Sequence, residues 1–190
     1  MNHQLNDLEL AQLYEPALLI TESPDQHDYL RNSLQQLIQP QTFIEHLWVA
    51  DLVHGEHEIW RLRRFRGRII RSNTPQALRN LLGLLTDVSE SDEIDYLVAK
   101  WFTNKSVKRT VSRILRDLGS DEASIDAEAL RLSIADVTLL DRRIAELELR
   151  RSKIFLRIED HRAGLAVPVV TKLDQRPQIN AAVSAESSDD

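Results

Sequence analysis

The sequence predicts an all-α protein, a bundle of about five to seven helices with a long helical hairpin as its spine. Apolar residues recur every three or four positions along most of the chain, which is typical of the buried face of an amphipathic helix. Only five glycines and six prolines interrupt the 190 residues, and most fall between these periodic segments. No segment shows the apolar–polar alternation of a strand, so the periodicity predicts helices alone.

The first helices are marked by their start signals. Ser23 precedes a proline and then an apolar-periodic run. Because Ser caps a helix and Pro fits its first position, we expect a helix here that ends before Pro40. Thr42 and the glutamate three residues later form a capping box, which opens a helix over 43–71. Thr74 and the proline after it start a Leu-rich helix.

Shorter helices follow these. The apolar residues of 94–101 predict one helix. Val107, Val111 and Ile114, at four- and three-residue spacing, predict the next. Gly119 ends that helix, because glycine readily adopts the left-handed conformation just beyond a helix C-terminus.

The strongest periodicity lies between 134 and 162, where eight positions follow a heptad seam and six of them are apolar. About 30 residues of helix extend about 45 Å. The 43–71 helix has nearly the same length, so we expect the two helices to pack side by side as a hairpin. The seam positions are Val137, Leu140, Ile144, Leu147, Arg151, Ile154, Ile158 and His161.

Charge divides the chain into three parts. Residues 1–22 hold four acids and no Lys or Arg, and we expect a flexible acidic lead segment. Residues 164–190 hold four acids against two basic residues and are predicted to form a disordered acidic tail. Acids and bases balance over 23–163, which predicts a single helical domain without the overall field that attracts nucleic acid or an anionic membrane.

Composition excludes several functional classes. The chain has no cysteine, which removes disulfides, thiolate zinc sites and iron–sulfur clusters and suits the reducing cytoplasm. No apolar run reaches the roughly 20 residues that span a bilayer, and no Lys or Arg precedes Arg31, so we expect neither a membrane segment nor a signal peptide. Gly-rich phosphate loops and the G-x-S-x-G elbow are missing, so no catalytic residue, cofactor or metal is assigned.

A set of short features recurs along the chain: Glu45, the Trp-Arg-Leu-Arg-Arg segment 60–64, and the segments 144–151 and 158–162 of the heptad helix. Together they resemble a group of uncharacterised bacterial all-helical proteins, in which a Trp-Arg-Leu-Arg-Arg helix is paired with a C-terminal coiled-coil-like helix. The likeness covers residues 20–163 and departs at 103–125, where Gly119 interrupts what would otherwise be a longer central helix. The resemblance implies an all-α fold and no known activity.

An arginine cluster is the first candidate site. Arginine binds phosphates bidentately and stacks on bases, so the cluster is a candidate contact for a protein partner or for nucleic acid. Arginines near a helix C-terminus also complement its dipole and pair with carboxylates, so a structural, salt-bridged role is weighed beside the binding role. Helical spacing places four of its arginines on one side, next to a tryptophan: Trp60, Arg61, Arg64, Arg68 and Arg71. Arg63 and Arg66 point elsewhere.

A helix-turn-helix hidden in 110–132, with its turn near Gly119, is the second candidate. Its second helix would turn four carboxylates toward the phosphates of DNA, which is electrostatically unfavourable. We therefore interpret this segment as a glycine-capped helical corner. The four acids are Asp121, Glu122, Asp126 and Glu128.

The third candidate is a metal site on one helix, formed by Asp51, His54, His57 and Glu58. A di-metal four-helix site needs carboxylates from other helices and a second Glu-x-x-His, which the sequence lacks. The H-E-x-x-H order of zinc proteases is missing too. We interpret these residues as a solvated polar face.

These observations predict a non-enzymatic interaction or structural protein that self-associates through its long amphipathic helices. An apolar stripe about 45 Å long must be covered, and we expect the short helices to leave part of it free. Arg151 and His161 interrupt the seam and are candidates for setting register or partner choice. Two alternatives stay open: a nucleic-acid-associated protein using the Arg-rich helix 60–71, and a metal-dependent helical enzyme using the polar residues of 51–58.

Overall fold

The computed structural model describes residues 7–85, 91–117 and 119–166 and is all-α within these ranges, which confirms the predicted fold class. No helix of the described residues combines the length and the apolar character that a membrane crossing requires. The helices are α1 (Asp7–Leu13), α2 (Pro24–Ile38), α3 (Phe43–Ser72), α4 (Thr74–Leu85), α5 (Ser91–Trp101), α6 (Lys105–Asp117), α7 (Glu122–Leu132) and α8 (Ile134–Ala166).

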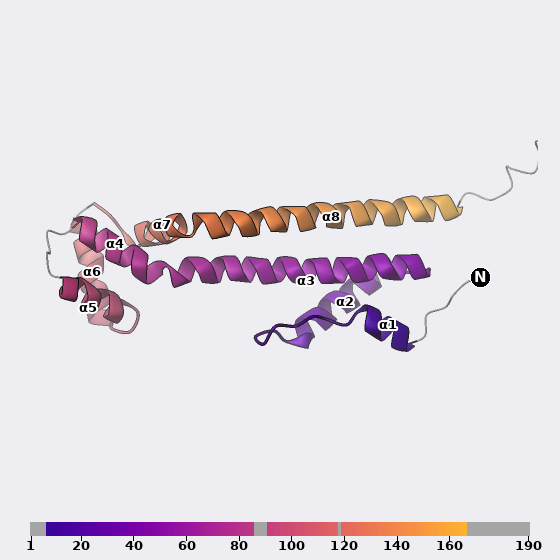
Figure 1. Cartoon of the computed structure of the whole chain (residues 1–190), viewed down its shortest axis with the longest axis horizontal. Helices are drawn as coiled ribbons and strands as arrows, with labels where there is room; N and C mark the ends of the chain where they lie inside the picture. The colour runs from indigo at the N-terminus through magenta and orange to yellow at the C-terminus, as the bar shows by residue number, and fades with distance from the viewer. Residues whose placement is uncertain (1–6, 86–90, 118, 167–190) are drawn as a thin grey trace, which may run out of the picture.

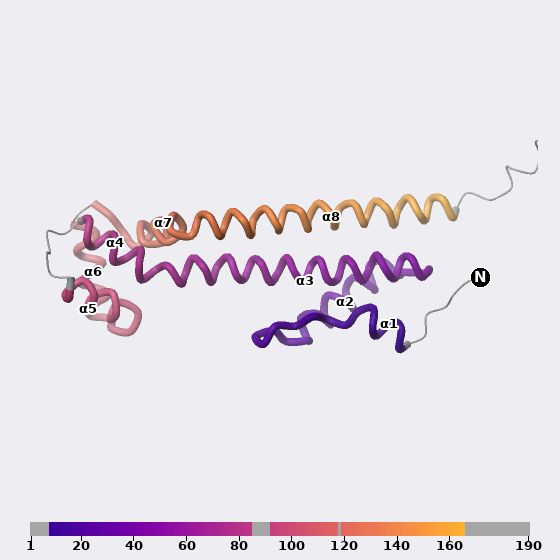
Figure 2. Tube along the Cα trace, in the orientation of Figure 1, coloured from indigo at the N-terminus to yellow at the C-terminus, as the bar shows by residue number. Residues whose placement is uncertain are grey.

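Figure 1 shows an elongated molecule whose spine is the predicted hairpin, with α3 and α8 lying side by side along its length. The short helices α4 to α7 form a head at one end of the hairpin. The tube in Figure 2 shows the chain leaving α3 into this head and returning along α8. At the other end, α1 and α2 lie on the side of α3 away from α8.

Two of the predicted helix starts are confirmed by side-chain hydrogen bonds, and α4 begins at Thr74 as predicted. The Oγ of Ser23 accepts the amide of Asp25 at 3.2 Å, so Ser23 caps α2. Thr42 and Glu45 complete a capping box, because each side chain accepts a hydrogen bond from the other residue's amide. These local bonds satisfy amides that the first turn of a helix leaves free.

The apolar core is divided into three clusters along the length of the molecule. The head has its own core, drawn from α4 to α7, which includes Leu78, Leu82, Val111 and Leu115. A second cluster joins α2, α3 and the end of α8 around Tyr14. Between them, the centre of the hairpin is held by a small cluster from α3 and α8 alone: Ile59, Leu62, Ile144 and Leu147, with Leu140 packed against it.

Ion pairs border the apolar seam between α3 and α8 along most of its length. Carboxylates in the first half of α3 pair with arginines in the second half of α8, and the signs are reversed toward the head. The pairs are Glu45–Arg162, Asp51–Arg150, Glu56–Arg151, Arg63–Glu148 and Arg66–Asp141, at 2.7, 2.8, 2.7, 2.7 and 2.9 Å.

Candidate functional site

Two arginines of the predicted cluster bind a single buried carboxylate. Glu22, whose side chain is 1% exposed, accepts hydrogen bonds from Arg61 Nε at 2.9 Å and Arg64 Nη2 at 2.7 Å. Arg61 also donates to the carbonyl of Ala17 at 2.7 Å and pairs with Glu58. The hydrogen bond from Arg61 lowers the pKa of Glu22 to about 2. These contacts tie the segment between α1 and α2 to α3.

The remaining members of the cluster have different surroundings. Arg63 and Arg66 pair with carboxylates of α8, and Trp60 packs against the α2–α3–α8 core. Arg68 and Arg71 are exposed and form no ion pair with a described residue. The geometry therefore supports the salt-bridged role for Arg61 and Arg64, and leaves two cations of the cluster open to a partner or to nucleic acid.

The predicted heptad seam of α8 lies on one face of the helix and is covered by α3 of the same chain. Arg151 donates to Glu56 at 2.7 Å, and the His161 ring meets the Trp48 ring edge-on at 5.4 Å between centroids. This seam holds the hairpin together and offers no free surface to a second copy. Five of its eight members are buried and three are half-buried: Val137, Ile144, Leu147, Ile154 and Ile158, then Leu140, Arg151 and His161.

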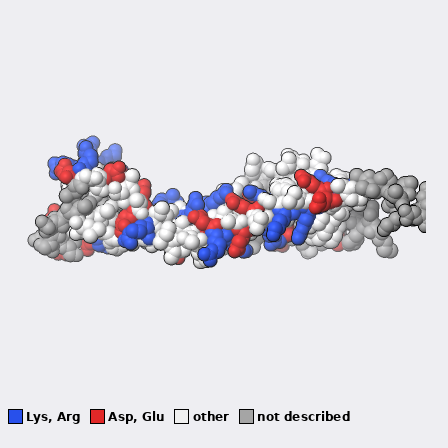
Figure 3. All heavy atoms as spheres, turned by 90° about the horizontal axis from the view of Figure 1, so that it is seen from above, with Lys and Arg blue, Asp and Glu red and all other residues white. Residues whose placement is uncertain are grey.

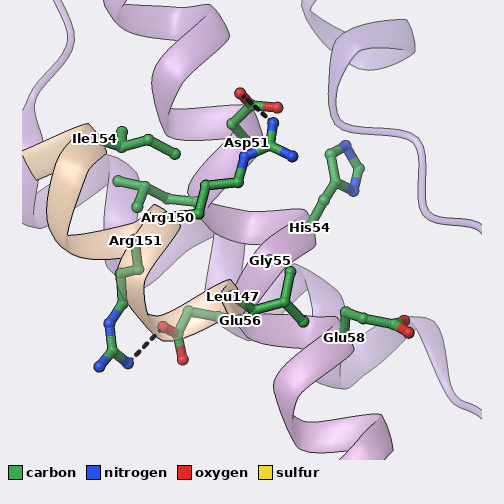
Figure 4. Close-up of a pocket in the computed structure, with 10 residues that line it drawn as sticks. Asp51, His54, Gly55, Glu56, Glu58, Leu147, Arg150, Arg151 and Ile154 are labelled. Atoms are coloured by element: carbon green, nitrogen blue, oxygen red, sulfur yellow. Dashed lines mark hydrogen bonds and ion pairs between the residues drawn. The ribbon is translucent and has the colours of Figure 1, made fainter. Parts of the chain in front are cut away.

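A groove lies between α3 and α8 at Gly55, beside the candidate metal ligands. Figure 4 shows the Asp51–Arg150 and Arg151–Glu56 pairs crossing from one helix to the other, with Glu58 directed away from both. The groove holds about 160 Å³, which is below the roughly 300–1,000 Å³ of small-molecule sites. Apart from Glu58, the charged side chains that line it form ion pairs between α3 and α8.

Of the candidate ligands, Asp51, His54 and Glu58 point in different directions, and His57 is buried under α2. Asp51 pairs with α8, Glu58 pairs with Arg61, and His54 Nε2 lies 3.2 Å from the carbonyl of Leu13. Over the described residues, no group of three or more His, Asp or Glu side chains is placed to hold a metal ion. The arrangement explains these residues as contacts between helices.

The structure reveals a cluster of three histidines between α2 and α3. The ring centroids of His54 and His57 each lie 5.5 Å from that of His27, which is 0% exposed. The expectation of a solvated polar face is wrong for His57, because α2 covers it and its side chain is buried. No spacing in the sequence signals this cluster, since His27 joins it only through the packing of α2 on α3.

Burial lowers the pKa of two of these histidines, His27 and His57. It lowers the pKa of His27 to about 4, and the neighbouring imidazoles of His54 and His57 lower it further. Burial also lowers the pKa of His57. Both ring nitrogens of His27 and the Nε2 of His57 have no hydrogen-bond partner among the described residues. The rings of His27 and His57 therefore pack as neutral groups near pH 7.

The corner between α6 and α7 is capped by glycine, as predicted. Gly119 has a φ of 72°, and the amide of Ser120 reaches back to the carbonyl of Leu115 at 2.8 Å. Asp121 caps α7 through the amide of Ser124 at 3.0 Å. Glu122 and Asp126 of α7 are exposed, whereas Glu128 is half-buried and accepts hydrogen bonds from Asn80 and Arg131.

A second heptad seam follows the outer face of α8, opposite the buried one, and all its members are exposed. Leu149 and Leu156 are 58% and 59% exposed at its centre. This seam cannot be recognised from the sequence alone, because only the structure shows which side of α8 is covered by α3. Its positions, spaced four and three apart, are Ala145, Leu149, Ser152, Leu156, Glu159 and Ala163.

The chain matches no protein-family model, no curated protein and no solved structure.

Proposed function

We propose that the protein is a non-enzymatic helical interaction protein that self-associates through the outer seam of α8. The observation that carries this proposal is the pair of exposed leucines, Leu149 and Leu156, one heptad apart on the side of α8 that faces away from α3. A cysteine-free chain of this kind suits the reducing cytoplasm, which is where we place the protein.

The thin centre of the hairpin favours such pairing. Its core cluster contains residues of α3 and α8 only, whereas the two ends of the molecule have cores that include further helices. Two paired helices bury one stripe each and leave their outer sides in water. A second hairpin laid along α8 would turn this two-helix section into a four-helix bundle.

The outer seam has the form that helix pairing requires. Leucines placed seven residues apart act as knobs at equivalent positions of successive heptads. Ala145 and Ser152 lie one position before each leucine in the seam and are small, so another helix can approach closely. From Ala145 to Ala163 the seam runs about 27 Å.

Light scattering during size-exclusion chromatography tests the proposal. We expect the wild-type protein to elute as a dimer at micromolar concentrations and L149E/L156E to elute as a monomer, because two carboxylates cannot be buried where the two leucines would pack. Leu139→Glu is the matched control, since Leu139 is also exposed on α8, at 65%, but lies off the seam. It should leave the dimer intact.

A wild-type protein that stays monomeric up to about 100 μM, which corresponds to less than roughly 5.5 kcal/mol of association free energy, would refute the proposal. A dimer that persists in L149E/L156E would place the interface elsewhere. Circular dichroism of each variant checks that the helices remain folded.

A further inference from the structure

Helices α5 and α6 of the head form a helix-turn-helix unit. The candidate in the sequence, 110–132, corresponds instead to α6 and α7. Helices α5 and α6 are joined by a turn of three residues, 102–104. Asn104 fixes this turn, because its Oδ1 accepts the amides of Ser106 at 2.9 Å and Val107 at 3.3 Å and so caps α6. The order and size of the parts match a DNA-binding helix-turn-helix, whose second helix faces the duplex.

Packing holds α6 with one face inward. Val107, Val111 and Leu115 of α6 are buried in the head core together with Val98 and Trp101 of α5. These three positions are spaced by four residues and form a single stripe. The opposite side of α6 therefore faces solvent and is held rigidly by the core beneath it.

That outward side of α6 is basic. All five of its cations are exposed, and its only acid is Asp117 at the last position. Figure 3 shows Lys and Arg side chains gathered at one edge of the head with acidic side chains beside them, and acids and bases alternating along the hairpin. The five cations are Lys105, Lys108, Arg109, Arg113 and Arg116.

Four of these five cations are free to meet an anionic partner. Lys108 pairs with Glu122 at 3.1 Å and lies 5.1 Å from the centroid of the Trp101 ring. The other four form no ion pair with any residue that the structure describes. They recur once per turn along about 16 Å of helix.

We propose that α6 binds double-stranded DNA, with Lys105, Arg109, Arg113 and Arg116 contacting phosphates that border the major groove. A row of cations with one residue per turn follows a line of phosphates, and B-form DNA has a major groove about 12 Å wide that admits a helix. The deep, narrow major groove of A-form RNA does not admit one.

An anionic membrane fits this surface less well. Helices that lie on membranes insert an apolar face, and the apolar face of α6 is already buried in the head. The inference does not depend on self-association, because the outer seam of α8 and the basic face of α6 share no residue.

Fluorescence anisotropy with a labelled random-sequence duplex of about 20 base pairs, at about 50 mM and then about 200 mM salt, tests the proposal. We expect the full-length wild-type protein to bind at the lower salt and to lose affinity steeply at the higher one. R109E/R113E should weaken binding at least about tenfold at 50 mM salt, because it replaces two phosphate contacts with repulsion.

Lys153→Glu with Arg157→Glu on α8 is the matched control. Both residues are exposed and form no ion pair with a described residue. Their substitution changes the net charge of the protein by the same amount as R109E/R113E. The control variant should bind DNA within about twofold of wild type, since it leaves the α6 contacts intact.

Three results would overturn the proposal. The first is no DNA binding by wild type at about 50 mM salt, where phosphate contacts are strongest. The second is equal weakening by both double variants, which would assign binding to net charge rather than to α6. The third is binding to an RNA duplex or to phosphatidylserine vesicles that is as tight as binding to DNA.

Discussion

Glu22 shows how a single carboxylate positions a whole segment. It lies in a sequence stretch without a single Lys or Arg, so its partners had to come from elsewhere in the chain. Arg61 and Arg64, one turn apart on α3, supply them. A buried carboxylate that loses its partners costs several kcal/mol, and this cost keeps the segment before α2 against α3.

His27 is the residue at which acid should first weaken the protein. Its pKa falls from 6.5 in an unfolded chain to about 4 when buried, so the unfolded state binds more protons between these values. The contribution of neutral His27 to the free energy of unfolding is fully present above pH 6.5 and is lost as the pH falls toward 4. We expect the free energy of unfolding to fall by roughly 1–3 kcal/mol over this range.

Urea titrations from pH 7 to about pH 4.5 measure this effect, since the slope with pH reports the protons taken up on unfolding. His27→Leu keeps a side chain of similar size and removes one titrating ring, so the variant should show a flatter profile, in which the remaining slope comes from the other histidines with a lowered pKa, His46 and His57. Glu22 does not interfere, because its contribution is lost only as the pH falls from 4.5 toward 2. A slope that is unchanged in His27→Leu would contradict the assignment.

At the scale of elements, two glycines should respond in opposite directions to the same substitution. Gly119 has a left-handed φ of 72°, so Gly119→Ala should destabilise the protein by about 1 kcal/mol. Gly55 lies inside α3, and a Cβ there would meet no atom within 4 Å. Gly55→Ala should therefore stabilise α3 by about 0.5–1 kcal/mol. The urea midpoint should fall in Gly119→Ala and rise in Gly55→Ala. Shifts of the midpoint in the same direction would refute the argument from backbone conformation.

The helices could be predicted from the sequence because their signals are local. The capping box at Thr42 marks the start of α3, and the spacing of the seam on α8 marks its inner face; neither depends on the rest of the fold. The side of α3 that α2 covers has no such signal, so His57 was expected in solvent and is buried. Contacts between helices decide which polar residues end up inside, and they involve residues far apart in the chain.

The candidate surfaces were harder to predict for the same reason. The number and spacing of arginines in 60–71 identified a cluster, but the buried Glu22 that binds two of them is about 40 residues away. The basic face of α6 becomes distinct only when Val107 and Val111 are known to be buried and Lys105 and Arg109 to be exposed. Sequence periodicity identifies the faces of a helix, and packing decides which face remains free.

At the scale of the whole molecule, the charges that border the hairpin specify how α3 and α8 align. The acidic first half of α3 meets the basic second half of α8, and Arg63 and Arg66 meet Glu148 and Asp141 near the head. Each exposed pair is worth only up to about 1 kcal/mol. A shift of one helix along the other would, however, bring like charges together at several places at once. The pairs therefore contribute to register more than to stability.

Reversing the charges near the head tests this idea. R63E/R66E should lower the free energy of unfolding by roughly 1–2 kcal/mol, because the two introduced carboxylates would face Glu148 and Asp141 of α8. Adding D141R/E148R to the same protein restores opposite signs, with the arginines now on α8 and glutamates on α3. We expect this quadruple variant to recover most of the loss at low salt and the difference to shrink at about 1 M salt, where charges are screened. A quadruple variant no more stable than R63E/R66E would show that the arginines act through packing of their side chains on α8 rather than through their charge.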